Sequence, residues 1–132
     1  MEILSKISLI LDATTLIIIL ASTIVGVLIG ALPGLSSGMA IALLLPFTIY
    51  LEPSLAIASM AALYCGGTFG GSITAILINA PGAPPAAATA FDGFPMAQKG
   101  QAGKALGMAA VSSVVGGIIS LIVLIIFAPT LA

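Results

Sequence analysis

Long apolar segments without a single charged residue dominate this chain. The first, Thr14–Leu32, is apolar apart from small hydroxyl residues, and as a helix it is long enough to cross a bilayer core of about 30 Å. The last, residues 105–128, has the same character. Only 5% of the 132 residues are charged, whereas soluble domains carry about 25%. The chain is therefore predicted to be an all-α integral membrane protein with several passes through the bilayer.

Two further apolar segments lie between these spans, and each contains residues that disfavour a continuous helix. Residues 35–51 are short and include Pro46, which predicts either a tilted crossing or a re-entrant segment. Residues 54–79 are too long for one crossing, and Cys65–Ser72 places four glycines in their middle. This run is either two half-helices with an unwound joint or one helix with a glycine-lined packing face. The sequence thus predicts about three to four transmembrane or re-entrant helical segments, broken at Pro-Gly and glycine-rich points.

A proline- and glycine-rich segment, residues 80–104, precedes the last span. Its prolines and glycines predict a non-helical backbone that ends at Asp92-Gly93, and its small alanines would let a solute approach that backbone. Asp92 is the one acidic residue in the segment. It is either a cap for a short helix that begins at Pro95, or a protonatable or cation-coordinating group in a membrane cavity.

The composition excludes several functions. The chain has three basic residues and no histidine, so it lacks the basic surface that binds nucleic acid. Its four acidic residues are spread along the sequence, and no catalytic pair or triad can be assembled from them. Cys65 has no second cysteine to pair with, and we interpret it as a small packing residue. We therefore expect no enzyme, no metal site and no cofactor other than a transported cation.

Glycines spaced four residues apart predict close helix packing. Lipid tails give helices no hydrophobic reason to associate, so small residues that let two backbones approach must supply the packing. One row runs through Gly26, Gly30, Gly34 and Gly38 and is predicted to form one face of a helix. The residues assigned to helix packing are Gly26, Gly30, Gly66 and Gly67.

Broken helices inside a membrane leave backbone N–H and C=O groups that a solute or an ion can satisfy. The chain combines two Pro-Gly breaks with neighbouring hydroxyl and amide side chains. Helix N-termini suit anions, whereas carbonyl and hydroxyl oxygens suit sodium. The candidate substrate- or ion-binding residues are Pro33, Gly34, Ser36, Ser37, Gly70, Gly71, Ser72, Thr74, Asn79, Pro81, Gly82, Thr89 and Asp92.

Two stretches of the chain resemble a known transporter family. Gly26–Ile49, with its Leu-Pro-Gly-Leu-Ser-Ser-Gly run, is similar to the opening of TctA, the large membrane subunit of tripartite tricarboxylate transporters. Tyr64–Gly107 carries, in the family's order, the Gly-Gly-Ser-Ile-Thr run, the Asn-x-Pro-Gly run and the Thr-x-x-Asp-Gly-x-Pro-Met-Ala run. The resemblance covers nearly all of the chain.

The resemblance implies a multi-pass protein of the bacterial inner membrane that takes up citrate or a related carboxylate by secondary, cation-coupled transport. It implies two partners, a small TctB-like membrane subunit and a periplasmic TctC-like binding protein, and a coupling ion that is Na⁺ or H⁺. It places substrate or ion contacts at Pro33-Gly34 and within Gly70–Asp92. Because TctA proteins are much longer, we expect this chain to be an N-terminal part that does not transport alone. The alternative is a small non-transporting membrane protein that acts by helix packing with partner subunits.

Overall fold

The computed structural model describes residues 12–131, with side chains described through residue 128, and these residues form helices and no strand. In chain order the helices are α2 (Ala13–Gly30), α3 (Ser37–Thr48), α4 (Pro53–Ile78), α5 (Ala86–Gln98) and α6 (Ala102–Leu131). Helices α2, α4 and α6 are long and apolar enough to cross a membrane. The predicted all-α membrane fold is confirmed.

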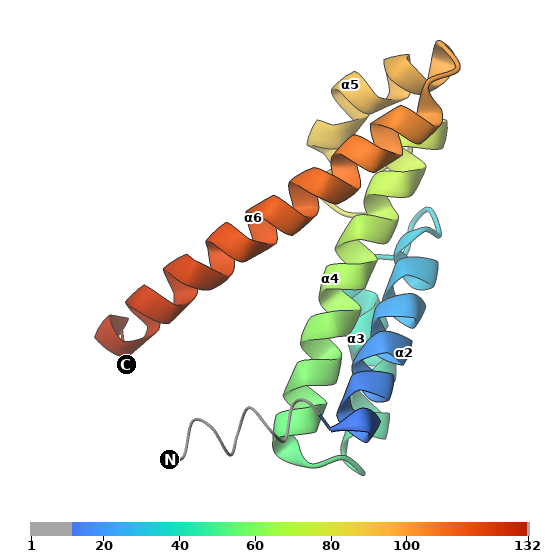
Figure 1. The fold of residues 1–132 in the computed structure, drawn as a ribbon. Helices are drawn as coiled ribbons and strands as arrows, with labels where there is room; N and C mark the ends of the chain where they lie inside the picture. Colours follow the sequence, from blue (N-terminus) through green and yellow to red (C-terminus); the bar gives the residue numbers. More distant parts are fainter. Residues whose placement is uncertain (1–11, 132) are drawn as a thin grey trace.

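Helices α2 and α4 form the central pair of the structure and run parallel (Figure 1). The positions that face each other rise together along both helices: Gly66 lies against the backbone of Thr23, whereas Gly70 lies against the backbone of Val27 and Ala31. The helices approach this closely because glycine presents no side chain at the contact. The packing surface of this pair is therefore made of backbone atoms.

The glycines assigned to packing all lie at this α2–α4 contact. A methyl group on Gly26 or Gly30 would overlap backbone atoms of Leu63 or Gly67. The row does not continue on one helix face, however, and that part of the prediction is wrong. Helix α2 ends at Gly30, Gly34 has a φ of 90° in the following turn, and Gly38 belongs to α3. The helix ends before Gly34 because Pro33 does not fit a helix interior.

Helix α3 returns the chain to the end of the pair where α2 begins (Figure 1). With 12 residues it is about 18 Å long, and it links the end of α2 to the start of the parallel helix α4. Its N-terminus is capped by Ser36, whose hydroxyl accepts the Met39 N–H at 3.2 Å. Residues 31–36 are thus the turn of an antiparallel helical hairpin.

Helix α4 is one continuous helix through the glycine run Cys65–Ser72. Pro53 lies in its first turn, where a missing N–H costs nothing. Gly66, Gly67, Gly70 and Gly71 are buried, so the helical backbone at these positions is covered by neighbouring segments. Of the two alternatives, the structure has the glycine-lined packing face and no unwound joint.

The chain reverses direction after α4 and reverses again before α5. Gly82 lies beside Gly71, whereas Gly93 lies beside Ile76. Residues 79–85 therefore descend about two turns along α4, and α5 then runs beside the last part of α4 in the same direction. Figure 1 shows α5 at the end of the bundle, next to the start of α6.

Two predictions for residues 80–104 are wrong. The segment is helical from Ala86 to Gln98, and Asp92 lies inside this helix instead of capping one that begins at Pro95. The prolines that precede the helix are Pro84 and Pro85, and the alanines that follow them favour helix strongly. Pro95 is accommodated within α5, although proline in a helix interior costs about 3 kcal/mol.

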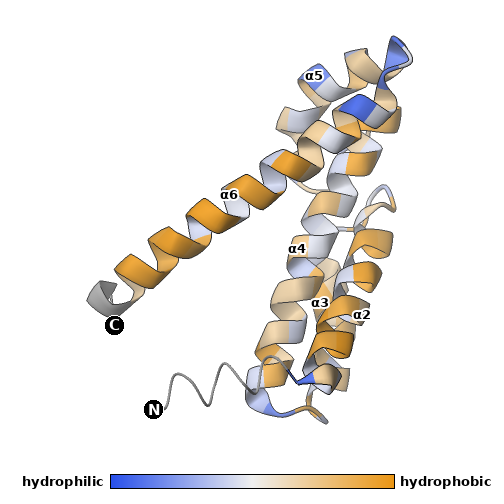
Figure 2. Ribbon diagram, in the orientation of Figure 1, coloured by the Kyte–Doolittle hydropathy of each residue, from blue (hydrophilic) through white to orange (hydrophobic). Residues whose placement is uncertain are grey.

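Helix α6 leaves the bundle and diverges from α4 along its length (Figure 1). Its residues from Val111 to Ala128 are all exposed within the described part of the chain. Figure 2 shows that this half is strongly hydrophobic, whereas hydrophilic residues gather where α5 connects to α6. The exposed half has the character of a surface that meets lipid or another membrane segment.

Candidate functional site

The two turns that contain the Pro-Gly pairs meet at one level of helix α4. We call residues 31–36 the first break and residues 79–85 the second break. Gly67 faces Gly30 at the end of α2 and also faces the side chain of Ser37 at the start of α3. One turn further along α4, Gly71 lies against Gly82 of the second break. Gly82 in turn approaches the carbonyl oxygen of Gly30. The end of α2, the start of α3 and the Pro81-Gly82 segment therefore converge on Gly67–Gly71.

The helices that follow the breaks start at this level and point in opposite directions. Helix α3 begins at Ser37 and runs back toward the start of α4, whereas α5 begins at Ala86 and runs toward the end of α4. The positive ends of both helix dipoles are thus directed toward the region of Gly67–Gly71. An anion at this level would face the N-termini of both helices.

The backbone of the second break is held by a small number of contacts. The Gly82 N–H donates to the Gly71 carbonyl over 3.5 Å, and the Ala80 N–H donates to the Thr74 carbonyl over 3.3 Å. Asn79 ends α4 in the left-handed conformation, with a φ of 55°. Glycine and asparagine are the residues that adopt this conformation most readily at a helix end. The sharp reversal after α4 thus depends on Asn79.

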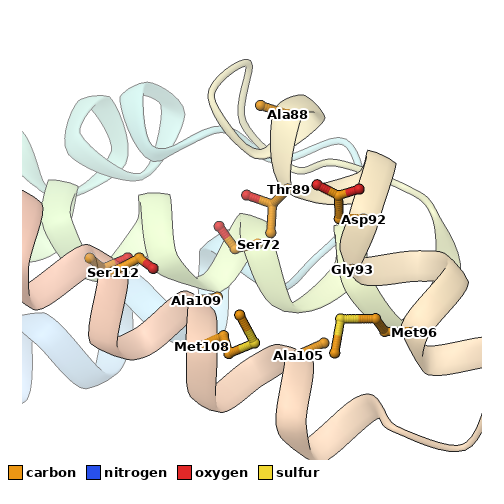
Figure 3. Close-up of a pocket in the computed structure, with 11 residues that line it drawn as sticks. Ser72, Ala88, Thr89, Asp92, Gly93, Met96, Ala105, Met108, Ala109 and Ser112 are labelled. Carbon is orange, nitrogen blue, oxygen red and sulfur yellow. The ribbon is translucent and has the colours of Figure 1, made fainter.

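A polar groove of about 370 Å³ opens between α4, α5 and α6. Figure 3 shows Ser72 of α4 and Thr89 of α5 side by side in this groove, with Asp92 on the next turn of α5. Ser112 and Ser113 of α6 line the opposite wall. The other lining residues are Ala88, Gly93, Met96, Ala105, Met108 and Ala109.

Hydroxyl groups in the helices divide into two kinds. The Thr74 hydroxyl is buried and donates to the Gly71 carbonyl at 3.1 Å, so it has a structural role. The Ser72 hydroxyl donates to the Thr68 carbonyl over a long 3.4 Å, and its oxygen faces the groove. Thr89 and Ser112 donate to no carbonyl group within residues 12–131. The groove therefore contains hydroxyl groups that can contact a ligand.

The structure distributes the predicted binding residues over four places. Ser72, Thr89 and Asp92 line the polar groove. Asn79 and Pro81 line a second, mostly apolar groove of about 400 Å³ with Phe91 and Phe94. The backbones of Gly70, Gly71 and Gly82 pack at the level where the breaks meet, close to the buried residues Ser37 and Thr74. Pro33, Gly34 and Ser36 form the first break, where Pro33 and Gly34 are exposed.

Sequence reasoning missed the contribution of α6. Ser112 and Ser113 line the polar groove together with Met96 and Met108, but none of them was among the candidate residues. The one available signal was the adjacent pair of serines inside an otherwise apolar span. A helical hydroxyl usually returns its hydrogen bond to its own backbone, so this signal alone could not be separated from ordinary helix chemistry.

Fold and groove together define a helical membrane protein in which two chain reversals meet beside α4 and a polar groove opens between α4, α5 and α6. The model of the tripartite tricarboxylate transporter TctA family matches residues 16–132, and the chain belongs to this family. It is also 45% identical, over 109 residues, to a protein of Agrobacterium vitis described as an uncharacterized 52.8 kDa protein in the TAR-I ttuC' 3' region. This match covers 83% of the chain and 22% of the relative, so the chain spans about a fifth of that protein's length. No solved structure matches the chain.

Asn79 offers a test of whether its backbone conformation decides the reversal after α4. We expect Asn79→Gly to leave the unfolding free energy nearly unchanged, because glycine adopts a φ of 55° easily. Asn79→Val should destabilise the protein by about 1–2 kcal/mol, because a side chain branched at Cβ fits the left-handed region poorly. The unfolding free energy in a detergent titration measures both effects. A glycine variant that is as unstable as the valine variant would instead assign a structural role to the Asn79 amide.

Proposed function

We propose that this chain forms part of the membrane-embedded subunit of a secondary transporter that takes up citrate or a related carboxylate with a coupling cation. Membership of the TctA family supports the transporter class. The observation that carries the proposal is the convergence of two helix breaks at Gly67–Gly71, with the N-termini of α3 and α5 directed toward the same level. Helix N-termini that point at a common site near the membrane midplane hold anionic substrate groups in secondary transporters.

A carboxylate would be held here mainly by backbone groups. The chain contains no arginine, so no bidentate side-chain clamp for a carboxylate is available within it. Helix N-termini supply N–H groups and a partial positive charge in its place. The first break leaves Pro33 and Gly34 exposed, and the second leaves Pro81, Pro84 and Pro85 exposed, whereas Ala83 and Ala86 are buried. We assign the substrate contacts to the first break and to residues 81–86.

The proposal includes the partners and the location of the family. A small TctB-like membrane subunit and a periplasmic TctC-like binding protein would complete the transporter in the bacterial inner membrane. The exposed half of α6, from Val111 to Ala128, supports a need for further membrane segments beside it. Because the substrate path must also be closed from that side, residues 12–131 by themselves would not transport.

The alternative, a protein that acts only by helix packing with partners, has less support. Its glycine rows were predicted to receive partner helices. Gly26, Gly30, Gly66 and Gly67 instead lie inside the contact between α2 and α4 of this chain. Those glycines are therefore occupied within the chain.

Uptake of labelled citrate tests the proposed function. The protein would be co-expressed with TctB and TctC subunits in cells that lack their own citrate carriers. We expect uptake that requires the binding protein and stops when the cation gradients are dissipated. A second tricarboxylate, a dicarboxylate and a monocarboxylate would compete as unlabelled solutes to define the substrate class. Uptake no greater than in cells without the protein would contradict the proposal.

A further inference from the structure

We infer that the polar groove between α4, α5 and α6 binds a monovalent cation, Na⁺, and that the carboxylate binds elsewhere. This inference rests on the proposed function, since it assigns a place to the coupling ion. It begins from the charge of the groove lining. Asp92 is the one charged residue among the lining residues, all of which belong to the described chain.

The sign of this charge decides between the two solutes. A carboxylate in the groove would meet the negative Asp92 side chain and be repelled, whereas a cation would be attracted. Lys99 and Lys104 are exposed and do not line the groove, so neither offsets the charge from within it. The groove thus suits a cation, and the helix N-termini near Gly67–Gly71 remain for the anion.

The neighbouring side chains supply the ligands that such an ion requires. Hard cations take oxygen ligands, and Thr89 and Ser72 lie beside Asp92 in the groove (Figure 3). Ser112 of α6 lies toward the other end of the groove from Asp92 (Figure 3), so the first ligands come from α4 and α5. One carboxylate with neutral hydroxyls carries a single negative charge, which matches Na⁺ better than a divalent ion. Water can complete the coordination because the groove is open to its surroundings.

The groove lies next to the region of Gly67–Gly71 where the substrate is proposed to bind. Ser72 directly follows Gly71, which lies against Gly82 of the second break. Thr89 and Asp92 belong to α5, the helix that this break introduces. An ion held by both α4 and α5 would therefore fix the position of α5 and of the Pro81-Gly82 segment before it. Coupling would arise because the bound ion orders the backbone that receives the carboxylate.

Binding of ²²Na⁺ to the purified protein in detergent, measured without any carboxylate, tests the inference. Choline chloride keeps the ionic strength constant. We expect saturable binding that Asp92→Asn weakens by at least about tenfold, as the loss of a charged ligand requires, and that Thr89→Val also weakens. Glu52→Gln removes the same charge from an exposed position at the start of α4 and should leave binding unchanged. Size-exclusion elution checks that each variant is folded.

Three results would overturn the inference: no ²²Na⁺ binding by the wild-type protein, wild-type affinity in Asp92→Asn, or an equal loss in Glu52→Gln. The outcome is separable from that of the proposed function. Citrate uptake without sodium binding removes the ion site and keeps the transporter, with protons as the remaining coupling ion. Sodium binding without uptake of any carboxylate keeps the ion site and removes the transporter.

Discussion

Replacing Gly30 with leucine should abolish the folded protein, whereas the same replacement at Gly107 should not. The Cβ of a side chain at position 30 would overlap the carbonyl group of Gly67, which belongs to the α4 backbone and cannot rotate away. Helices α2 and α4 would have to separate, and the turn between α2 and α3 would lose its position. Gly107 has no atom near enough to meet an added Cβ within the described chain, so it is a matched control.

The measurement is the yield of monodisperse protein after extraction, together with the unfolding free energy of the milder alanine variants. We expect Gly30→Leu to give almost no monodisperse protein and Gly30→Ala to lose about 1–3 kcal/mol, as for overpacked interiors. Gly107→Ala should gain up to about 1 kcal/mol, because alanine is the better helix former. Equal yields for Gly30→Leu and Gly107→Leu would show that α2 and α4 do not pack through this glycine.

Replacing Gly82 with alanine should remove transport while the central helix pair stays folded. The added methyl group would lie 2.5 Å from the Gly30 carbonyl oxygen and 3.1 Å from the Gly71 Cα. The Pro81-Gly82 segment would move away from α4, and α5 would move with it. A displacement of about 1 Å in a binding site can cost as much as a hundredfold in rate, so we expect citrate uptake to fall by at least about tenfold.

Gly103→Ala is the control for this variant, because an added Cβ at Gly103 meets no atom within 4 Å in the described chain. It should retain most of the uptake. Thermal unfolding should separate Gly82→Ala from the Gly30 variants, since Gly82 takes no part in the direct contact between α2 and α4. Wild-type uptake in Gly82→Ala would mean that the second break does not need its position against Gly30 and Gly71.

The long helices were predictable from the sequence because a charge-free apolar run of sufficient length has one stable arrangement in a bilayer. The runs at Thr14–Leu32 and 105–128 correspond to α2 and α6 with small shifts at their ends. The close packing of Gly26 and Gly66 also followed from their spacing. The partner of each glycine did not, because spacing identifies a face of a helix and does not say which helix covers it.

The short helix α5 was missed for a physical reason. Pro84 and Pro85 were interpreted as breaks and Pro95 as the start of a short helix. A proline at the beginning of a helix favours it, however, and Pro95 lies inside α5. The Ala86–Ala88 run favours a helix and should have been interpreted as the start of one. The direction of α5 could not be predicted at all, because it depends on the reversal at Asn79 and on contacts between Gly82 and residues distant in the sequence.

The residues of the polar groove were also predictable only in part. Thr89 and Asp92 were identified from the sequence, since polar side chains in a membrane chain are few. Their separation by three residues places them on one face once the segment is known to be helical. Ser112 and Ser113 come from a helix that meets α5 only through the tertiary fold. Local patterns therefore gave one wall of the groove, and the fold supplied the other.

The distance between the two chain breaks tests the central claim of convergence most directly. Spin labels would be attached to Pro33→Cys and Pro84→Cys in a Cys65→Ser background, and to Glu52→Cys and Pro84→Cys as the reference pair, all at exposed positions. Pulsed electron resonance then gives both distances in lipid. We predict a short Pro33–Pro84 distance and a Glu52–Pro84 distance longer by about 20–30 Å, the length of α4 between those levels. Equal distances for the two pairs, or a longer one for Pro33–Pro84, would contradict the convergence and the binding site proposed from it.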